Sequence, residues 1–411
     1  MTDLAPRLRP LEAFPVQHEG REMIALRDPA GYTDAIMLLP RVLLEIVSLF
    51  DGEHSIADIQ AAVMRRYAEL VPRERITEIA DALDEQGFLD SSRFAERRAA
   101  IDRAFLEAPT RPAAHGGGAY PLDPAEVRTF FDSFFAPPEG PGAVDGSGPG
   151  RPRVIGAIAP HIDFHRGGSA YAWAYRDVAE RSDADLFVVL GTCHAGMANP
   201  FALTLKAYES PLGQVPVDRE FAEALATRAR QDCFGSEAAH RKEHSIEFQA
   251  VFLRHLFAGR REISIVPVLA SFAHEALASG GRVDDDPRIP RFLEALVETI
   301  AASGRRVTLI AGADLAHVGP RFGDPEPVSP ADLATLGDED RAMLEAVEAG
   351  DAEAFFDGVA RDGDRRRICG LSPIYALLRA LGGARGTLRR YGQWPDPQGV
   401  VTFASVVFDA P

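Results

Sequence analysis

Two histidines in this sequence each follow an apolar run of strand length. His161 comes directly after Ile155-Gly-Ala-Ile-Ala-Pro, and His194 comes directly after Leu186-Phe-Val-Val-Leu-Gly-Thr-Cys. Imidazole nitrogens are common metal ligands and common acids or bases in catalysis. In α/β proteins, functional side chains gather outside the carboxyl ends of parallel strands. The spacing therefore predicts that both histidines line one cleft, with His165 as a weaker candidate.

Two later segments place further acid, base or ligand groups at similar positions. Glu243-His-Ser-Ile-Glu precedes an amphipathic helix, and Asp314-Leu-Ala-His follows another strand pattern. A carboxylate beside an imidazole can orient the ring or tune it as an acid or base. We therefore predict catalytic roles for His244, Asp314 and His317. Because Asp314 and His317 are three residues apart, we expect them to meet on one helical turn.

A cysteine adds a softer ligand type. Cys369 lies in Ile368-Cys-Gly-Leu-Ser-Pro, before a helix pattern and after Arg365-Arg-Arg. A thiol at a helix N-terminus among cations is expected to have a lowered pKa and to supply the thiolate that binds metals. Three cysteines are too few for a disulfide framework, and we interpret Cys193 as structural.

Each of these residues also has an ordinary structural interpretation. His161 could be a packed or capping histidine, Glu247 could complement a helix dipole, and Cys369 could be a small buried hydrophobe. Arg166-Gly-Gly indicates a turn, which weakens the case for His165. The convergence of histidines at three strand ends with a carboxylate and a cysteine favours a single metal or catalytic cleft.

Strand and helix patterns alternate from residue 154 onward. The candidate strands are 154–159, 185–191, 201–206, 263–269, 306–312 and 401–408. The candidate helices are 168–181, 218–230, 245–257, 288–303, 338–348 and 371–381. The pattern predicts an α/β sandwich, with a mixed sheet because the strands near 386–391 and 401–408 are consecutive.

Residues 1–95 have the pattern of a small separate unit. A hairpin around Pro29-Ala-Gly-Tyr is followed by helix patterns over 41–50, after Ser55 and over 74–86, and Phe88-Leu89 could begin a wing. This order is typical of a winged helix. The unit holds 10 lysines and arginines against 17 acidic residues, a balance of −7 that is unfavourable for DNA. Docking of a peptide or partner is favoured, and simple packing on a neighbouring domain remains the alternative.

Length and charge limit the classes of protein. A chain of 411 residues is too long for one ordinary core, so two domains are expected. The net charge of −17 argues against binding to nucleic acid or to anionic membranes. No apolar run approaches the roughly 20 residues of a membrane span, and the first residues lack an apolar signal core, so we expect a cytoplasmic protein.

The candidate motifs together resemble the Memo family, which includes the B proteins of the AmmeMemoRadiSam system. The resemblance covers about residues 113–411 and rests on motifs in the family's order: Ala159-Pro-His-Ile-Asp, Gly191-Thr-Cys-His, Glu243-His-Ser-Ile-Glu, Ala313-Asp-Leu-Ala-His and Ile368-Cys-Gly. It implies an α/β sandwich like that of class III extradiol dioxygenases. It also implies an iron or copper ion held by His161, His194 and Cys369, in a cleft that the other motifs line.

The sequence departs from the family pattern at both histidine ligands. The family commonly has Ala-Gly-Tyr after the first histidine, where this chain has Ile162-Asp-Phe-His. The family's Gly-Pro-Ser-His is replaced here by Gly191-Thr-Cys-His. Asp163 and His165 therefore add polar groups near the first ligand, and these could change the preference for metal or substrate.

The N-terminal unit resembles the small PqqD-like winged-helix domains. The similarity lies in Leu49-Phe-Asp-Gly-Glu-His-Ser-Ile-Ala-Asp-Ile and in Glu85-Gln-Gly-Phe-Leu. The expected organisation is a PqqD-like domain over 1–95, a connecting helix and linker over 96–112, and a Memo-like metal-binding domain over 113–411. The resemblance implies that the N-terminal domain docks a radical-SAM enzyme or its peptide substrate.

Two functional hypotheses follow. In the first, the protein is a dioxygenase-like oxidoreductase whose iron or copper ion activates O2, with His317 or His244 as acid or base. In the second, it is a non-catalytic module that binds a peptide or protein, and its metal is structural or regulatory. A thiolate in place of the carboxylate of an Fe(II) facial triad softens the site and favours Cu(I), or iron in another role.

Overall fold

The computed structural model describes residues 5–68, 70–146 and 150–411. The chain divides into two compact units, residues 1–107 and 108–411, which we call unit 1 and unit 2. The cytoplasmic prediction rests partly on the first residues of the chain, and residues 1–4 lie outside the described residues. Among the described residues, no helix is both long enough and apolar enough to cross a membrane.

Within its described residues, unit 1 combines a three-stranded antiparallel sheet with four helices. The strands, in the spatial order β1-β2-β3, are β1 (Glu12–His18), β2 (Arg21–Arg27) and β3 (Ile36–Pro40). The helices are α1 (Arg41–Val47), α2 (Ile56–Tyr67), α3 (Arg73–Glu85) and α4 (Ser92–Glu107). The predicted hairpin and helices are confirmed. The Ser55 hydroxyl caps α2 by accepting a hydrogen bond from the Asp58 N–H.

The expected wing strand does not form at Phe88-Leu89. Leu89 makes a single antiparallel bridge with Leu8, and Phe88 is fully buried in the core of unit 1. Two backbone hydrogen bonds flank this bridge, from the Arg9 N–H to the Phe88 carbonyl and from the Asp90 N–H to the Arg7 carbonyl. The winged-helix and PqqD-like assignments of this unit stay predictions.

Unit 2 is built on one large mixed sheet, as predicted. Its main path runs β11-β13-β5-β10-β6-β9-β7, with β12 paired to β13. The strands β5, β10, β6 and β9 are parallel, and β13 and β7 pair antiparallel to them. The strands are β5 (Val154–Ala159), β6 (Leu186–Thr192), β7 (Phe201–Leu203), β9 (Ser264–Ala270), β10 (Val307–Gly312), β11 (Asp314–Val318), β12 (Gly386–Asp396) and β13 (Gly399–Asp409).

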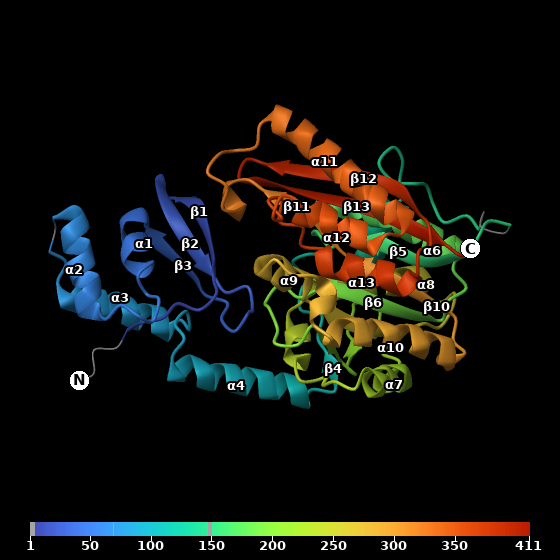
Figure 1. The fold of residues 1–411 in the computed structure, drawn as a ribbon, viewed down its shortest axis with the longest axis horizontal. Helices are drawn as coiled ribbons and strands as arrows, with labels where there is room; N and C mark the ends of the chain where they lie inside the picture. Colours follow the sequence, from blue (N-terminus) through green and yellow to red (C-terminus); the bar gives the residue numbers. More distant parts are fainter. Residues whose placement is uncertain (1–4, 69, 147–149) are drawn as a thin grey trace. The chain divides into compact units, whose positions relative to one another are not determined.

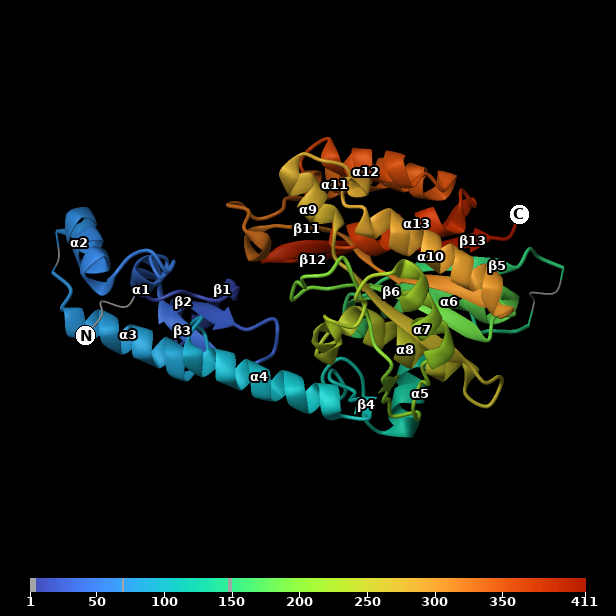
Figure 2. The ribbon, with the colours of Figure 1, turned by 60° about the horizontal axis from the view of Figure 1, so that its bottom comes forward.

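Helices cover both faces of this sheet (Figures 1 and 2). Alternate residues of β6 enter different cores: Leu186, Val188 and Leu190 enter one, and Phe187 and Val189 enter the other. The first face carries α7 (Arg219–Ala229), α9 (Ala273–Ser279), α10 (Arg288–Ser303), α11 (Pro330–Ala349), α12 (Ala352–Ala360) and α13 (Leu371–Leu381). The second face carries α5 (Pro124–Ser133), α6 (Phe164–Arg181) and α8 (His244–Phe257).

Three neighbouring strands end at the same edge of the sheet. Gly312 at the end of β10 lies in register with Ala159 of β5 on one side and with Gly191 of β6 on the other. His161, His194 and Asp314 each follow within a few residues of these positions. The parallel register is therefore what brings the candidate motifs together.

Several local predictions were wrong. The strand expected over 201–206 ends at Leu203, and Ala207–Tyr208 forms a separate short strand, β8, beside β4 (Thr110–Arg111). Arg166-Gly-Gly is not a turn, because α6 begins at Phe164 and runs through both glycines. A Cβ atom at Gly168 would lie 2.4 Å from the Phe134 ring, so these glycines permit close packing inside a helix.

Candidate metal centre

The structure brings His161, His194 and Cys369 together at the carboxyl ends of β5 and β6. Each offers one ligand atom, and the three atoms lie within 4.8 Å of one another. Cys369 Sγ is 3.2 Å from His161 Nε2, and the two imidazole centroids are 4.9 Å apart. His161 is buried, Cys369 is half-buried and His194 is exposed, so the cluster is open to solvent on the His194 side.

The tautomer of His161 follows from its hydrogen bond. Its Nδ1 is 2.9 Å from the Gly312 carbonyl oxygen, which can only accept, so Nδ1 carries the proton and Nε2 keeps its lone pair. Burial, reinforced by the nearby His194, lowers the pKa of His161 to about 3. The ring is therefore neutral at physiological pH, which is the form that binds a metal ion.

His194 is oriented by a buried carboxylate, Glu243. Its Nδ1 is 3.0 and 3.1 Å from the two Glu243 oxygens, and its backbone N–H donates to the same carboxylate at 2.8 Å. Burial opposes the charge of Glu243, but its contacts with His194 and His244 prevail and hold its pKa well below the usual range. Glu243 also caps α8 through the Ser245 N–H, so one carboxylate anchors both a helix and a candidate ligand.

Cys369 is held through its backbone. Its carbonyl oxygen accepts a hydrogen bond of 3.0 Å from the Thr192 hydroxyl, and the Gly370 N–H donates to the Asp314 carbonyl at 3.1 Å. A Cβ atom at Gly370 would lie 2.4 Å from that carbonyl oxygen. Only glycine therefore permits the close approach that places the thiol beside His161.

The predicted lowering of the Cys369 pKa was wrong. Burial raises the pKa of this thiol well above its usual value, and the carboxylates of Asp314 and Glu243 add to the effect. The expected cations are engaged elsewhere, because Arg365, Arg366 and Arg367 pair respectively with Glu339, Asp340 and Asp324. A metal ion at the cluster would have to supply the positive charge that stabilises a thiolate.

His244 lies directly beside the cluster. Its ring stacks on that of His194 at a centroid distance of 4.6 Å and lies 5.2 Å from that of His161. Burial and the neighbouring His194 lower the pKa of His244 well below its usual value. His244, Glu243 and His194 also form a second group whose ligand atoms lie within 4.8 Å of one another.

Asp314 and His317 reach the site from a strand and not from a helical turn, so that prediction is corrected. They lie in β11, whose register with β13 shifts between them. Asp314 accepts a hydrogen bond of 2.9 Å from the His161 N–H, and burial raises the pKa of Asp314. His317 donates from Nδ1 to the Leu315 carbonyl at 3.1 Å, and burial lowers its pKa to about 4. In a regular strand, residues three apart point to opposite faces of the sheet. The irregularity between Asp314 and His317 interrupts that alternation.

His165 lies outside the ligand cluster. Its side chain is exposed, and its ring is 5.0 Å from that of Phe130. It belongs to neither of the two possible ligand groups among the described residues.

Sequence reasoning missed a buried network behind His244. Arg111 and Glu247 are fully buried and paired, and Glu247 also accepts hydrogen bonds from His115 Nδ1 at 2.9 Å and from the Tyr120 hydroxyl. Arg111 Nη2 donates to the Glu243 carbonyl at 2.8 Å. No local pattern marks Arg111 as a partner of a residue 136 positions later.

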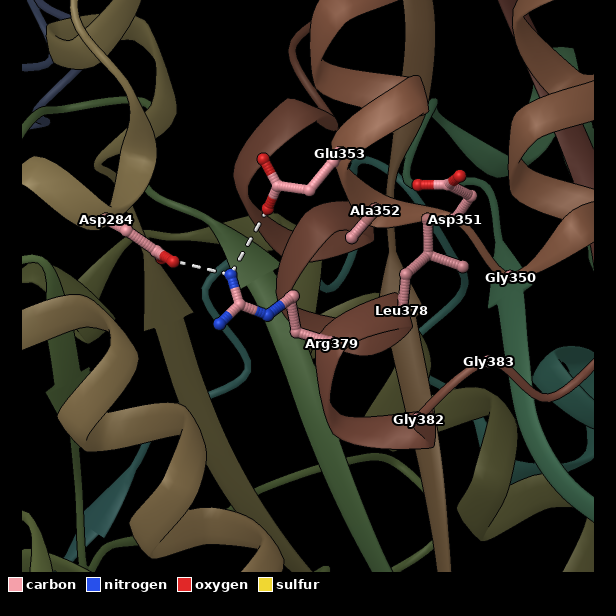
Figure 3. Close-up of a pocket in the computed structure, with 9 residues that line it drawn as sticks. All are labelled: Asp284, Gly350, Asp351, Ala352, Glu353, Leu378, Arg379, Gly382 and Gly383. Carbon is pink, nitrogen blue, oxygen red and sulfur yellow. Dashed lines mark hydrogen bonds and ion pairs between the residues drawn. The ribbon is translucent and has the colours of Figure 1, made fainter.

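A surface hollow at the ends of α11, α12 and α13 is separate from this centre (Figure 3). There Arg379 Nη1 lies 3.0 Å from an Asp284 oxygen and 3.3 Å from a Glu353 oxygen. The hollow shares no lining residue with the His/Cys cluster, and these charges pair with one another. We therefore assign it no role in the candidate site.

The fold and the site together define a class: a mixed-sheet α/β sandwich with a His/His/Cys cluster at the carboxyl ends of its central parallel strands. Residues 111–407 match the family model described as "Memo-like protein". This chain belongs to the Memo-like family, as the motifs indicated.

Relatives occur in bacteria and archaea. A MEMO1 family protein of Aquifex aeolicus is 26% identical over 400 residues, covering 96% of this chain and 98% of that protein. A MEMO1 family protein of Methanopyrus kandleri is 30% identical over 306 residues, covering 72% of this chain and 98% of that protein. A crystal structure of an uncharacterized Escherichia coli K12 protein aligns with 62% of this chain and 100% of its own at 15% identity, with a TM-score of 0.30.

Proposed function

We propose that this protein binds one redox-active metal ion, iron or copper, through His161 Nε2, His194 Nε2 and Cys369 Sγ, and uses it to oxidise a small or peptide substrate. One observation carries the proposal: His161, His194 and Cys369 each offer a ligand atom, and these atoms lie within 4.8 Å of one another at the carboxyl ends of the central strands.

The ligand geometry fits an ion. Two ligands at about 2.0 and 2.3 Å from one tetrahedral ion lie about 3.5 Å apart, and Cys369 Sγ is 3.2 Å from His161 Nε2. Each imidazole uses Nδ1 to bond an acceptor, the Gly312 carbonyl or the Glu243 carboxylate, which leaves Nε2 for the ion. Such acceptors fix the tautomer and the ring orientation of metal-binding histidines.

The ligand set is compatible with iron or copper. Two imidazoles and one thiolate are softer than the two imidazoles and one carboxylate of Fe(II) oxygenases, and they suit Cu(I) or iron. Such an ion would supply one-electron chemistry with O2. Because the pKa of Cys369 is raised, binding of the ion must release the thiol proton, so we expect affinity to rise with pH.

The neighbouring residues have distinct roles in this proposal. Asp314 holds His161 by accepting its backbone N–H. His317 and His244 have lowered pKa values and are therefore neutral at physiological pH, so each can accept a proton from a substrate in the cleft. The exposed side of His194 is where a substrate would enter.

Metal analysis of protein purified without oxygen tests the proposal. We expect a stoichiometric redox metal in the unmodified protein, and its loss in His161→Ala and Cys369→Ala. His165→Ala is the matched control, because it removes a nearby exposed imidazole and should leave the metal in place. Equal metal content in all four proteins would contradict the assignment. Oxygen uptake by the reduced, loaded protein tests oxidation separately, because bound metal without uptake would support a structural or regulatory ion.

A further inference from the structure

A closed hydrogen-bonded circuit lies behind the ligand cluster. Asp340, in the middle of α11, is fully buried. Its Oδ2 accepts from the Thr402 hydroxyl at 2.6 Å and from the Tyr391 hydroxyl at 2.9 Å, and its Oδ1 accepts from Arg366 Nη1. We call Asp340, Arg366 and Thr402, with the backbone groups of Ala316 and His317, the Asp340 circuit.

Both arms of the circuit end at β11. The Thr402 hydroxyl accepts a hydrogen bond of 2.9 Å from the Ala316 N–H, inside the irregularity that separates Asp314 from His317. The Arg366 carbonyl accepts one of 2.7 Å from the His317 N–H. One carboxylate therefore ties together β11, β13 and the segment that leads to Cys369.

The segment before Cys369 is conformationally strained. Asp364 and Arg367 have φ values of 56° and 53°, in the left-handed region that is unfavourable for most residues other than glycine. Such strain persists only where surrounding contacts hold it. The contacts here are the Arg366–Asp340 pair, the Arg367–Asp324 pair at 2.6 Å and a hydrogen bond of 2.8 Å from the Ile368 N–H to Asp364.

Burial of the Arg366–Asp340 pair is an inefficient way to gain stability. Removing an arginine and a carboxylate from water costs several kcal/mol, and well-packed apolar residues often stabilise equally well. A fully hydrogen-bonded polar network does, however, hold the groups around it in one defined arrangement. The groups whose positions this network fixes are a candidate ligand and two candidate catalytic residues.

We propose that Asp340 is a positioning residue of the metal centre, acting on Cys369 through Arg366 and on Asp314 and His317 through Thr402. The hydrogen-bond partners of Asp340 are Arg366, Thr402 and Tyr391, and none of these is a proposed ligand. This inference rests on the proposed function, because it assigns a role relative to the His161, His194 and Cys369 ligand set.

Titration of metal-free protein with Co(II) tests this role. Co(II) bound to a thiolate gives a charge-transfer absorption, which Cys369→Ser should abolish and so assign. In Asp340→Asn we expect Co(II) binding to weaken by up to about tenfold, the lower end of the range for a group that bonds a ligand directly, together with a weaker charge-transfer band. The readout is spectroscopic, so it needs neither a substrate nor catalytic activity.

Asp177→Asn is the matched control. Asp177 is also a buried carboxylate of unit 2, and it bonds Arg181 Nε at 2.9 Å near the C-terminal end of α6, away from the ligand cluster. It should lower the thermal midpoint without changing the affinity for Co(II) or the band. A second pair of variants covers the case in which Asp340→Asn fails to fold. Thr402→Val removes the hydroxyl and should weaken Co(II) binding, whereas Thr402→Ser should restore it.

The outcomes separate the two proposals. Unchanged Co(II) affinity and band in Asp340→Asn or in Thr402→Val would overturn the positioning role and leave the metal site intact. Equal weakening in Asp177→Asn would also overturn it, because the effect would then reflect general destabilisation. Absence of Co(II) binding by the unmodified protein would reject the proposed metal site itself.

Discussion

Buried arginine–carboxylate pairs in the two units serve different ends. In unit 1, Arg9 pairs with Asp28 at 2.9 Å, and Asp28 also accepts backbone N–H groups of a turn, including that of Tyr32 at 2.7 Å. In unit 2, Arg111 pairs with Glu247, whose other hydrogen bonds lead to the side chains of His115 and Tyr120. The first pair closes a turn, and the second supports the wall of a candidate site.

The comparison shows that a buried ion pair does not by itself mark a functional site. What matters is where its remaining hydrogen bonds lead. Within the described part of unit 1, no group of three histidine, cysteine or acidic side chains could hold a metal ion, whereas the described part of unit 2 has two such groups. The imidazoles beside the Arg111 pair, and not the pair itself, distinguish the two regions.

The largest expected effect comes from breaking the pair in unit 2. Glu247→Gln would leave the fully buried Arg111 charge without its partner, so we expect unit 2 to lose about 3–5 kcal/mol of unfolding free energy. Urea unfolding followed by tryptophan fluorescence measures this, because both tryptophans, Trp173 and Trp394, lie in unit 2.

The matched variant in unit 1 is Asp28→Asn. It should destabilise unit 1, which amide hydrogen exchange in β2 would detect, and leave the tryptophan transition in place. A shift of the tryptophan transition as large as that in Glu247→Gln would show that the two units do not respond independently.

Acid should weaken unit 2 through the same carboxylate. Although burial opposes its charge, Arg111 and His115 lower the pKa of Glu247 from 4.5 to about 2. A carboxylate whose pKa is lower in the folded state than in the unfolded state stabilises the fold fully at pH values above its unfolded pKa. This stabilisation is lost as pH falls from about 4.5 towards 2. We expect the difference in unfolding free energy between the unmodified protein and Glu247→Gln to shrink between pH 6 and pH 3, by about half or more. A constant difference would contradict the ionised pair.

A smaller effect is expected from the carboxylate that orients His194. Glu243→Gln keeps the side-chain shape but removes the charge beside His194 Nδ1, so we expect tenfold to hundredfold weaker metal binding. Competition with a chelator of known affinity measures it. Glu12→Gln, in unit 1, is the control for a general effect of lost charge and should bind metal normally.

The smallest effect is expected from an exposed pair in unit 1. Arg27 Nε lies 2.9 Å from Glu12 Oε2, and both side chains are about half exposed. Solvent screens such pairs, so Glu12→Gln should cost unit 1 less than about 0.5 kcal/mol. A loss comparable to that of Asp28→Asn, measured by hydrogen exchange in β2, would mean that burial is not what separates the two pairs.

Much of the fold and part of the site were predictable from local pattern. Buried parallel strands appear as apolar runs, so the ends of β5, β6 and β10 could be located to within about a residue or two. His161 and His194 follow two of those ends and were predicted for that reason. The helix over 371–381 was recognised from its period, which placed Cys369 just before it.

The errors share a physical cause. The Arg166-Gly-Gly segment was predicted as a turn because glycine weakens helices. In the helix, however, Phe134 and Ile162 pack so closely on the two glycines that no side chain would fit there. Asp314 and His317 were placed on a helical turn, but pairing with β13 makes the segment a strand. The Cys369 thiol was expected to lie among cations, but distant carboxylates engage those arginines.

By itself, the sequence determined which residues are of types that can act as ligands and which strand ends they follow, because apolar periodicity and turn signals act over a few neighbouring residues. Only the tertiary structure decided the partners of those residues. Gly312 sets the tautomer of His161, Glu243 orients His194, and Asp340 ties β11 to the segment before Cys369. These contacts join residues far apart in the chain. Whether a buried charge is paired, and what it then positions, is settled only when the sheet and its helices are assembled.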